Sequence, residues 1–226
     1  MLEFLEFARA NLPGMLSGTV ITVKLTLGSI FLGFLLGLPL SVLRSYGPHW
    51  LRRILLVYVN IFRGTPLLVQ LFVIYYGLPD LGVTFERMTA AYVTLALNSS
   101  AYQAEYFRGG FQAVGKGQMI AARAIGMSRA KAILFIILPQ ALRLAVPAWT
   151  NEFISMVKYT AVVFLIAVPD LMNRAKMISS QQFAPIQSYL LAAFIYLVLV
   201  GATTGLMRWA DKKLAIPGLN LHPEGH

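Results

Sequence analysis

The chain has 226 residues, of which 58% are hydrophobic, only 12% are charged and none is cysteine. A soluble domain usually carries about 25% charged residues, so this composition indicates a membrane protein, and the missing cysteine excludes disulfides and cysteine-ligated zinc. The net charge of +10 is compatible with an anionic surface or with nucleic acid, and the positions of the basic residues decide between the two.

Five apolar segments are long enough to cross a bilayer as helices, which takes about 20 residues each. They lie at about residues 15–43, 54–78, 89–107, 138–162 and 189–209. We therefore expect an all-α membrane protein that forms a single transmembrane domain over residues 1–226.

The Lys and Arg side chains predict how these helices are oriented. One side of the predicted membrane carries Arg44, Arg52, Arg53, Arg108, Lys116, Arg123, Arg129, Lys131, Arg208, Lys212 and Lys213. The opposite side carries only Arg9, Arg87, Arg174 and Lys176. Because cytoplasmic loops are enriched in Lys and Arg, we predict that the N-terminus lies outside and the C-terminus lies in the cytoplasm. Topology thus accounts for the positive charge, and we expect no nucleic-acid partner.

The second segment contains "FRGTPLLVQ", in which Pro66 removes a backbone hydrogen bond and Gly64 loosens the same turn. Transporters use the exposed backbone dipoles of broken helices to bind charged ligand groups. Thr65 and Gln70 are therefore candidates for binding a ligand carboxylate. A packing kink, with Arg63 paired elsewhere, explains the same residues equally well.

The third segment, "LALNSSAYQAEYF", places Asn98, Tyr102 and Glu105 on one helix face. Asn98 and Tyr102 are candidates for substrate contact, although Asn side chains also form hydrogen bonds between membrane helices. For Glu105 we expect a local ion pair with Arg108, three residues further on, rather than ligand contact.

The stretch "GFQAVGKG", residues 110–117, resembles a phosphate-binding loop. Such a loop follows a strand and ends in Ser or Thr, whose hydroxyl binds magnesium. Here the stretch follows a membrane helix, and its last residue is Gly117. We therefore expect no ATP site and interpret the stretch as a glycine-rich hinge. The three histidines also show no metal-ligand spacing, so we expect no metal site.

The predicted cytoplasmic loop, about residues 108–137, contains "GQMIAARAIGMSRAKAILFIILPQA". Residues 118–125 favour a helix, and Gly126 suits its C-terminus because glycine enters the left-handed region freely. Ser128 can cap a second helix, which we expect to end or kink near Pro139. Two short helices that meet at a turn form a surface suited to a groove in a partner protein.

The fourth segment contains Glu152 in "WTNEFISMVKYT", and a charge inside a membrane helix costs about 2.5–3.5 kcal/mol and usually marks function. Ser155 and Tyr159 share its helix face, so a cationic ligand finds a carboxylate and an aromatic ring there. The alternative is a structural ion pair of Glu152 with Arg143 or with Lys158 of the partner subunit.

The loop resembles the signature of membrane subunits of ABC importers, which is E-A-A, three residues, Gly, nine residues and Ile-x-Leu-Pro. The matching residues are Ala121, Ala122, Gly126, Ile136, Leu138 and Pro139. Ile120 departs from the pattern, which has Glu there, and this puts one polar contact to the ATPase in doubt. Three further stretches, "YVNIFRGTPLLVQLFVIYYGLP", "LNSSAYQAEYFRGGFQAVGKGQ" and "LPQALRLAVPAWTNEFISMVKYTAVV", are similar to polar amino acid importer permeases. "VPDLMNRAK" resembles the histidine/lysine/arginine branch, and the resemblance covers about residues 15–212.

This resemblance implies the type I ABC importer permease fold with five transmembrane helices, in the inner membrane of a prokaryote. It implies four partners: two cytoplasmic ATPase subunits that bind ATP and magnesium, an extracytoplasmic binding protein, and a second permease, either another copy or a related chain. It implies no cofactor on this chain itself. The residues that it assigns to the coupling helix in the ATPase groove are Met119, Ile120, Ala121, Ala122, Gly126 and Met127.

We therefore expect ATP-driven import of a polar amino acid, with a cationic one (arginine, lysine or histidine) favoured by Glu152. Glutamine or glutamate as the substrate of the same machinery is the alternative. An ion-coupled secondary transporter is the alternative from another class, but it normally requires internal repeats. A membrane enzyme requires a nucleophile with its base or metal ligands inside the membrane. Neither of these two classes explains the loop signature.

Overall fold

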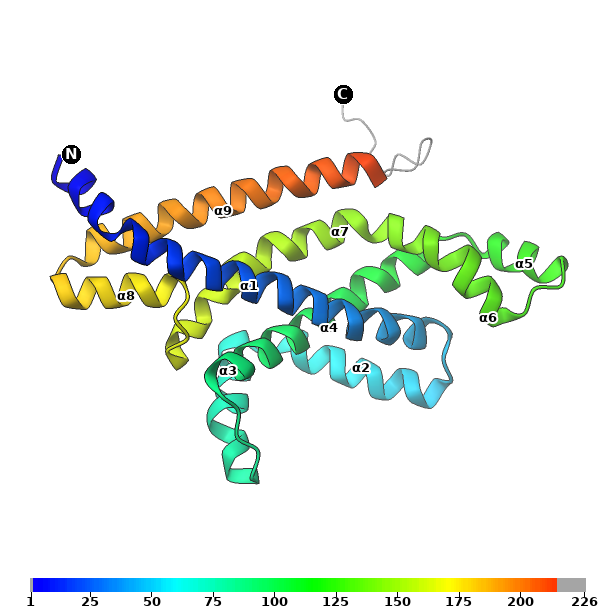
Figure 1. The fold of residues 1–226 in the computed structure, drawn as a ribbon. Coiled ribbons are helices and arrows are strands. Elements are labelled where there is room, and N and C mark those ends of the chain that lie inside the picture. The colour runs from blue at the N-terminus through cyan, green and yellow to red at the C-terminus, as the bar shows by residue number, and fades with distance from the viewer. Residues whose placement is uncertain (1, 215–226) are drawn as a thin grey trace.

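The computed structural model describes residues 2–214, and over that range its regular secondary structure is entirely helical (Figure 1). The α-helices are α1 (Leu2–Tyr46), α2 (His49–Gly64), α3 (Leu67–Phe72), α4 (Arg87–Ala113), α5 (Lys116–Ala124), α6 (Arg129–Ala132), α7 (Leu138–Tyr159), α8 (Leu171–Gln182) and α9 (Pro185–Leu214). Short π- and 3-10-helical segments extend some of them: η1 (Val73–Gly77), η2 (Leu78–Leu81), η3 (Ile133–Ile137) and η4 (Thr160–Ile166). The predicted all-α class is confirmed for the described residues.

The long helix α1 includes the predicted span 15–43 and packs closely against α4. Small residues permit this approach, because a Cβ atom added at Gly33 would lie 2.7 Å from the Gln103 amide nitrogen. A Cβ atom at Gly37 would lie 2.8 Å from the carbonyl oxygen of Ser100. Small interfacial residues let membrane helices approach in this way, and here they bring the polar side chains of α4 against the backbone of α1.

The second predicted span, 54–78, consists of two helices that meet at an angle of 106°. α2 ends at Gly64 and α3 begins at Leu67, with Thr65 in an extended conformation between them. A residue before proline is disfavoured in the helical region, so the Thr65–Pro66 sequence is the local cause of the bend. The break expected at Pro66 is confirmed.

A continuous helix of 38 residues runs from Arg129 to Ile166 and combines α6, η3, α7 and η4. Its first turn is capped by Ser128, whose hydroxyl accepts a hydrogen bond from the Lys131 N–H at 3.3 Å. Of the two outcomes expected near Pro139, an end or a kink, the end is wrong, because the helix continues to Ile166. The π-helical turn η3 ends two residues before the proline, and its wider ring lets the helix pass a residue that lacks an N–H.

By length and apolarity, three described helices qualify as membrane spans: Glu3–Tyr46, Arg129–Ile166 and Pro185–Lys213. A fourth span results if the two helical segments on either side of the bend, His49–Gly64 and Leu67–Leu81, are counted as a single span. α4 occupies the position of the third predicted segment, but its middle carries buried polar residues, namely Thr94, Asn98, Ser99, Ser100 and Gln103. The count of five spans and the orientation of the termini therefore stay predictions. The sequence did not predict α8, which lies against α1 and α9.

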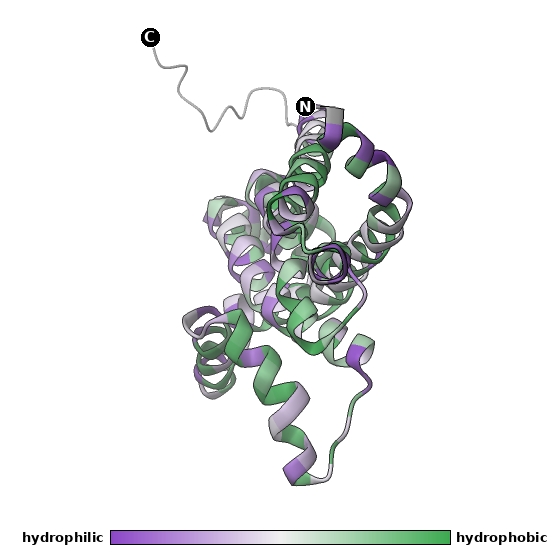
Figure 2. Cartoon of the chain, turned by 90° about the vertical axis from the view of Figure 1, so that its left-hand side faces the viewer, coloured by the Kyte–Doolittle hydropathy of each residue, from purple (hydrophilic) through white to green (hydrophobic). Residues whose placement is uncertain are grey.

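The apolar core lies between α1, α3, α4 and α7 and includes Leu25, Leu71, Leu95 and Met156. Many large apolar side chains are also exposed, and Figure 2 shows how hydrophobic residues are distributed over the helices. Phe31 on α1 and Leu197 on α9 are 62% and 69% exposed. An apolar outer surface is what a lipid environment requires.

Candidate functional site

The candidate site centres on the carboxylate of Glu152, where α7 faces α4. Glu152 is only 2% exposed, and the Ser99 hydroxyl donates a hydrogen bond to its Oε1 atom at 2.7 Å. The phenol of Tyr106 lies beside the same carboxylate. Within residues 2–214, no Lys or Arg forms an ion pair with Glu152. The carboxylate thus has two neutral hydroxyl neighbours and no cationic partner within the described chain.

Two residues that the sequence analysis missed hold Ser99 in position. The amide of Gln103, a fully buried residue, donates to the Ser99 hydroxyl at 2.9 Å and to the Ile30 carbonyl at 3.0 Å. The indole N–H of Trp149 donates to the other end of the same amide at 2.8 Å. Helical spacing is the signal that would have found them, since Gln103 lies one turn after Ser99 and Trp149 lies one turn before Glu152.

Tyrosine side chains also lie near the carboxylate. Tyr102 and Tyr106 have ring centroids 6.4 Å apart, and Tyr159, which is 37% exposed, lies near Tyr102 and Glu152. The guanidinium of Arg63 already lies 5.2 Å from the Tyr102 centroid. Cations are attracted to aromatic faces, so these rings and the carboxylate together form surroundings suited to a positive charge.

The other predicted candidates, Thr65, Gln70 and Asn98, form a separate polar cluster at the bend between α2 and α3. In an unbroken helix the carbonyl of Phe62 would accept a hydrogen bond from residue 66, but residue 66 is proline and has no N–H. The amides of Gln70 and Asn98 donate to this carbonyl instead, at 2.8 and 3.1 Å. Asn98 also donates to Gln70 at 3.1 Å, and Gln70 donates to the Thr65 hydroxyl at 2.9 Å. The interhelical hydrogen bonding expected as the alternative for Asn98 is therefore present.

The remaining residues considered beside Glu152 form no bond to it within the chain. Ser155 lies one turn further along α7, is half-buried and forms no hydrogen bond within the described residues. Arg143 and Lys158 are exposed, and neither forms a salt bridge inside residues 2–214. An ion pair of Glu152 with Lys158 of the partner subunit stays a prediction, because the structure contains one chain.

Glu105 forms the local ion pair that its spacing predicted. Its Oε2 atom lies 2.7 Å from the Arg108 guanidinium and 4.0 Å from that of Arg63, and its Oε1 atom pairs with Arg44. One carboxylate thus joins arginines from α1, α2 and α4. Glu105 holds three helices together at the end of the bundle that the basic residues predict to be cytoplasmic.

The predicted turn between the two loop helices is present at Gly126, which has a φ of +84°. Its N–H donates to the Arg123 carbonyl at 3.1 Å, and the N–H of Met127 donates to the Ala122 carbonyl at 3.1 Å. These two bonds form a Schellman motif, which requires a left-handed residue after the helix. The expectation that glycine terminates this helix is confirmed.

The loop presents apolar side chains outward. Ile120 and Ile125 are 68% and 79% exposed, whereas Ala122 is buried and Met119 packs against the cluster that contains Phe111. Ala121 is exposed on the same short helix. At the position where the importer signature has Glu, the surface offered by α5 is therefore apolar.

The stretch at residues 110–117 has no phosphate-loop geometry, because α4 continues through Ala113 and α5 begins at Lys116 without a strand. Gly110 is a packing residue in α4 rather than part of the expected hinge, since an added Cβ atom would collide with the Ala141 carbonyl. The described part of the chain holds no group of three His, Cys, Asp or Glu side chains that could bind a metal. His222 and His226 lie outside the described residues.

Comparisons with known proteins agree with this arrangement. The arginine transport system permease protein ArtQ of Bacillus subtilis is 37% identical over 208 residues, which cover 90% of this chain and 94% of ArtQ. The putative glutamine transport system permease protein GlnP of Rickettsia bellii is 35% identical over 217 residues, which cover 96% and 100% of the two chains.

A solved structure, described as an amino acid ABC transporter with histidines, superposes with a TM-score of 0.85 at 38% identity. The match covers 93% of this chain and 98% of that one, which confirms the predicted permease fold. The family described as binding-protein-dependent transport system inner membrane component matches residues 29–216. This chain therefore belongs to the family of inner membrane components of binding-protein-dependent transport systems.

Proposed function

We propose that this chain is the permease subunit of an ABC importer for a polar amino acid with a cationic side chain, namely arginine, lysine or histidine. The observation that carries this proposal is the buried carboxylate of Glu152, which has neutral neighbours and no basic partner within residues 2–214. Burial of an ionised carboxylate is unfavourable unless the charge is paired. A cationic ligand supplies the missing partner.

In this proposal the cationic group of the ligand binds between α4 and α7. Coulomb attraction to Glu152 favours a positive side chain in these low-dielectric surroundings, and the faces of Tyr102 and Tyr106 add cation–π attraction. Ser99, held by Gln103, fixes the orientation of the carboxylate. Ser155 and Asn98 stay candidate polar contacts, and Thr65 and Gln70 stay candidates for binding the carboxylate of the ligand.

The energy for import comes from partner subunits, and the chain itself performs no covalent chemistry. Two cytoplasmic ATPases bind and hydrolyse ATP with magnesium, an extracytoplasmic binding protein delivers the amino acid, and a second permease copy or a related chain completes the pathway. The exposed apolar surface of α5 docks in the ATPase groove. The whole assembly resides in the inner membrane of a prokaryote.

Glutamine is the second candidate substrate, because a relative of 35% identity is named a glutamine transport permease. Glutamate is disfavoured, since its side chain would be repelled by Glu152. An ion-coupled secondary transporter is disfavoured by membership in a family of binding-protein-dependent systems.

The test is ATP-driven uptake of labelled arginine into proteoliposomes that contain the assembled complex, in competition with glutamine and with glutamate. We expect rapid uptake that excess lysine suppresses and glutamate does not. Uptake that glutamine or glutamate suppresses best would overturn the cationic substrate and return Glu152 to a structural role. Uptake that proceeds without ATP would overturn the importer mechanism itself.

A further inference from the structure

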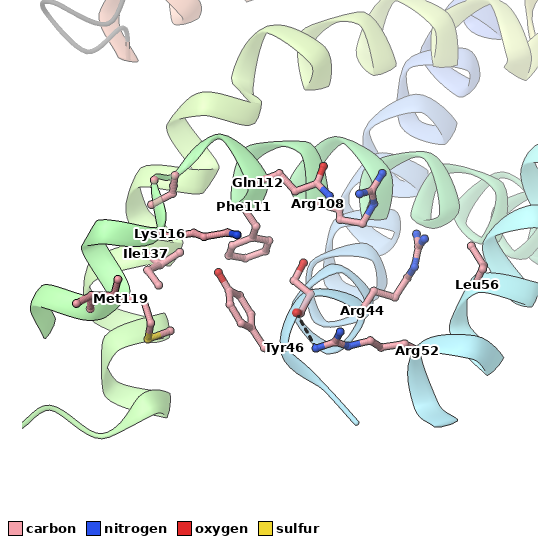
Figure 3. A pocket seen from close by; sticks show the side chains of 14 residues that line it. Arg44, Tyr46, Arg52, Leu56, Arg108, Phe111, Gln112, Lys116, Met119 and Ile137 are labelled. Carbon is pink, nitrogen blue, oxygen red and sulfur yellow. Dashed lines mark hydrogen bonds between the residues drawn. The ribbon is translucent and has the colours of Figure 1, made fainter. Parts of the chain in front are cut away.

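A pocket of about 790 Å³ (Figure 3) lies at the end of the bundle that the basic residues predict to be cytoplasmic, and Glu152 does not line it. The ends of α1 and α4, the first turns of α2, the helix α5 and the segment η3 form its walls. Arg44, Arg52 and Arg108 lie on one side of it, and Lys116 points into it from the opposite side (Figure 3). The side that carries Lys116 is otherwise apolar and includes Phe111, Met119 and Ile137.

This pocket has more positive charge than the chain neutralises. Glu105 pairs with both Arg44 and Arg108 and supplies the only carboxylate bonded to these four side chains within residues 2–214. The guanidinium of Arg52 donates to the Ser45 carbonyl at 3.1 Å, while its buried Nε atom has no hydrogen-bond partner. Lys116 pairs with no carboxylate of the described chain. The pocket therefore favours an anion.

Exposed apolar side chains of α2 beside the arginines favour an anion that carries a hydrocarbon chain. Leu56 lies one turn after Arg52 on α2, lines the pocket and is 43% exposed. The outer face of α2 continues with Ile54 and Val57, which are 57% and 58% exposed. A hydrocarbon chain can thus leave the pocket past Leu56 onto a surface suited to lipid, whereas a free phosphate would leave these exposed apolar side chains of α2 uncovered.

We propose that this pocket binds the phosphate headgroup of an anionic phospholipid from the cytoplasmic leaflet. Basic pockets between membrane helices at the cytoplasmic side are suited to such headgroups. The phosphate lies among Arg44, Arg52, Arg108 and Lys116, and an acyl chain follows Leu56. Because Lys116 belongs to α5 while Arg44 and Arg52 belong to α1 and α2, the bound lipid ties the loop helix to the body of the permease.

The test measures lipid retention by the assembled transporter, purified in mixed micelles of phosphatidylglycerol and phosphatidylcholine, by native mass spectrometry. The test variant is Arg52→Gln/Lys116→Gln. The matched control is Arg53→Gln/Lys131→Gln, which removes the same charge from neighbouring exposed positions outside the pocket. We expect the wild type and the control to retain phosphatidylglycerol over phosphatidylcholine, and the test variant to retain it about tenfold less.

Three outcomes would overturn the proposal. The first is that the two double variants retain phosphatidylglycerol equally. The second is that inorganic phosphate displaces the lipid at equal concentration, which would identify a soluble anion as the ligand. The third is that the lipid binds only after the ATPase subunits are removed, which would identify an acidic side chain of the ATPase as the occupant. If the test variant fails to assemble, Leu56→Trp replaces it, because this change fills the apolar exit and keeps every charge. We expect Leu56→Trp to lower phosphatidylglycerol retention, and unchanged retention would contradict the proposal.

Discussion

Glu152 and Asp170 both carry almost completely buried carboxylates. Their different hydrogen-bond donors are the reason that we assign Glu152 to a candidate ligand site and Asp170 to a structural one. Asp170 lies at the N-cap of α8 and accepts a hydrogen bond from the Asn173 N–H at 2.9 Å. The backbone of a helix N-terminus therefore offsets part of the cost of burying its charge. Glu152 lies in the middle of α7, where no free backbone N–H is available, and within residues 2–214 side-chain hydroxyls are its only donors.

The first prediction concerns Glu152→Gln, which keeps the shape of the side chain and removes its charge. A hydrogen bond to a charged group contributes about 1.5–3 kcal/mol, so we expect arginine uptake to fall roughly 10- to 100-fold. Glutamine uptake should fall much less, because a neutral side chain gains no Coulomb attraction. The measurement is initial uptake of both labelled amino acids in proteoliposomes, and equal losses would remove Glu152 from side-chain recognition.

The second prediction is a pH dependence of stability from Asp170, which lies in the connection between the candidate spans. Burial raises the pKa of Asp170 from 3.8 to about 6, although its hydrogen bonds act in the opposite direction. The folded protein therefore binds this proton more tightly than the unfolded chain does, and its contribution to stability declines as the pH rises from about 4 to 6.

Asp170→Asn tests this dependence, because Asn retains the helix cap and carries no charge. We expect this variant to melt at a higher temperature than the wild type at pH 7, and the difference to shrink as the pH is lowered toward 4. The measurement is thermal unfolding of the detergent-solubilised complex between pH 4.5 and pH 8. Parallel pH profiles for the two proteins would show that the burial of Asp170 does not control this stability.

At the scale of single elements, some structural features could be predicted from short sequence motifs and others could not. The bend at Pro66, the turn at Gly126 and the cap at Ser128 were predictable, because each depends on the backbone preference of one or two residues. The continuation of the helix through Pro139 was not, since it depends on the π-helical turn η3. α8 was missed because "LMNRAKMISSQQ" has no long apolar run, and its burial comes from contact with α1 and α9.

The candidate site, like the fold, could be predicted from the sequence only in part. Glu152 was identifiable as a charge within an apolar segment, but its partner Ser99 lies on another helix, and no local pattern links the two. Gln103 and Trp149 bond to each other only because α1, α4 and α7 pack closely. Thr65, Gln70 and Asn98 were identified as polar residues, whereas the bonds that Gln70 and Asn98 donate to the Phe62 carbonyl follow from the bend.

The third prediction concerns the Schellman turn at Gly126, where the φ of +84° disfavours every residue with a Cβ atom. A β-branched residue there costs roughly 1–2 kcal/mol, so Gly126→Val should distort the turn and abolish most ligand-stimulated ATPase activity. Gly126→Asn is the matched control, because Asn tolerates the left-handed region, and it should retain most of the activity. Membrane insertion of both should match the wild type, and full activity of the Val variant would contradict a coupling role for this turn.

At the scale of the whole molecule, the basic residues predict an orientation that chemical labelling can test. The chain has no cysteine, so a single introduced thiol is the only one in this subunit. We expect a membrane-impermeant maleimide to label Asp80→Cys from outside intact cells, and Lys131→Cys only after the membrane is opened. Both native side chains are exposed. Labelling in the opposite pattern would invert the topology and would also move the basic pocket to the outer surface.

The uninterrupted helix from Arg129 to Ile166 has a mechanical consequence for the molecule as a whole. At about 1.5 Å of rise per residue, Glu152 lies roughly 35 Å along the axis from the end that adjoins the Gly126 turn. In the proposed coupling this helix acts as a lever, so a tilt of a few degrees at the loop would become a displacement of ångströms beside Ser99. The π-helical turn η3 lies near the loop end of the helix, and its stiffness would set how much of that motion reaches Glu152 and how much is absorbed as bending.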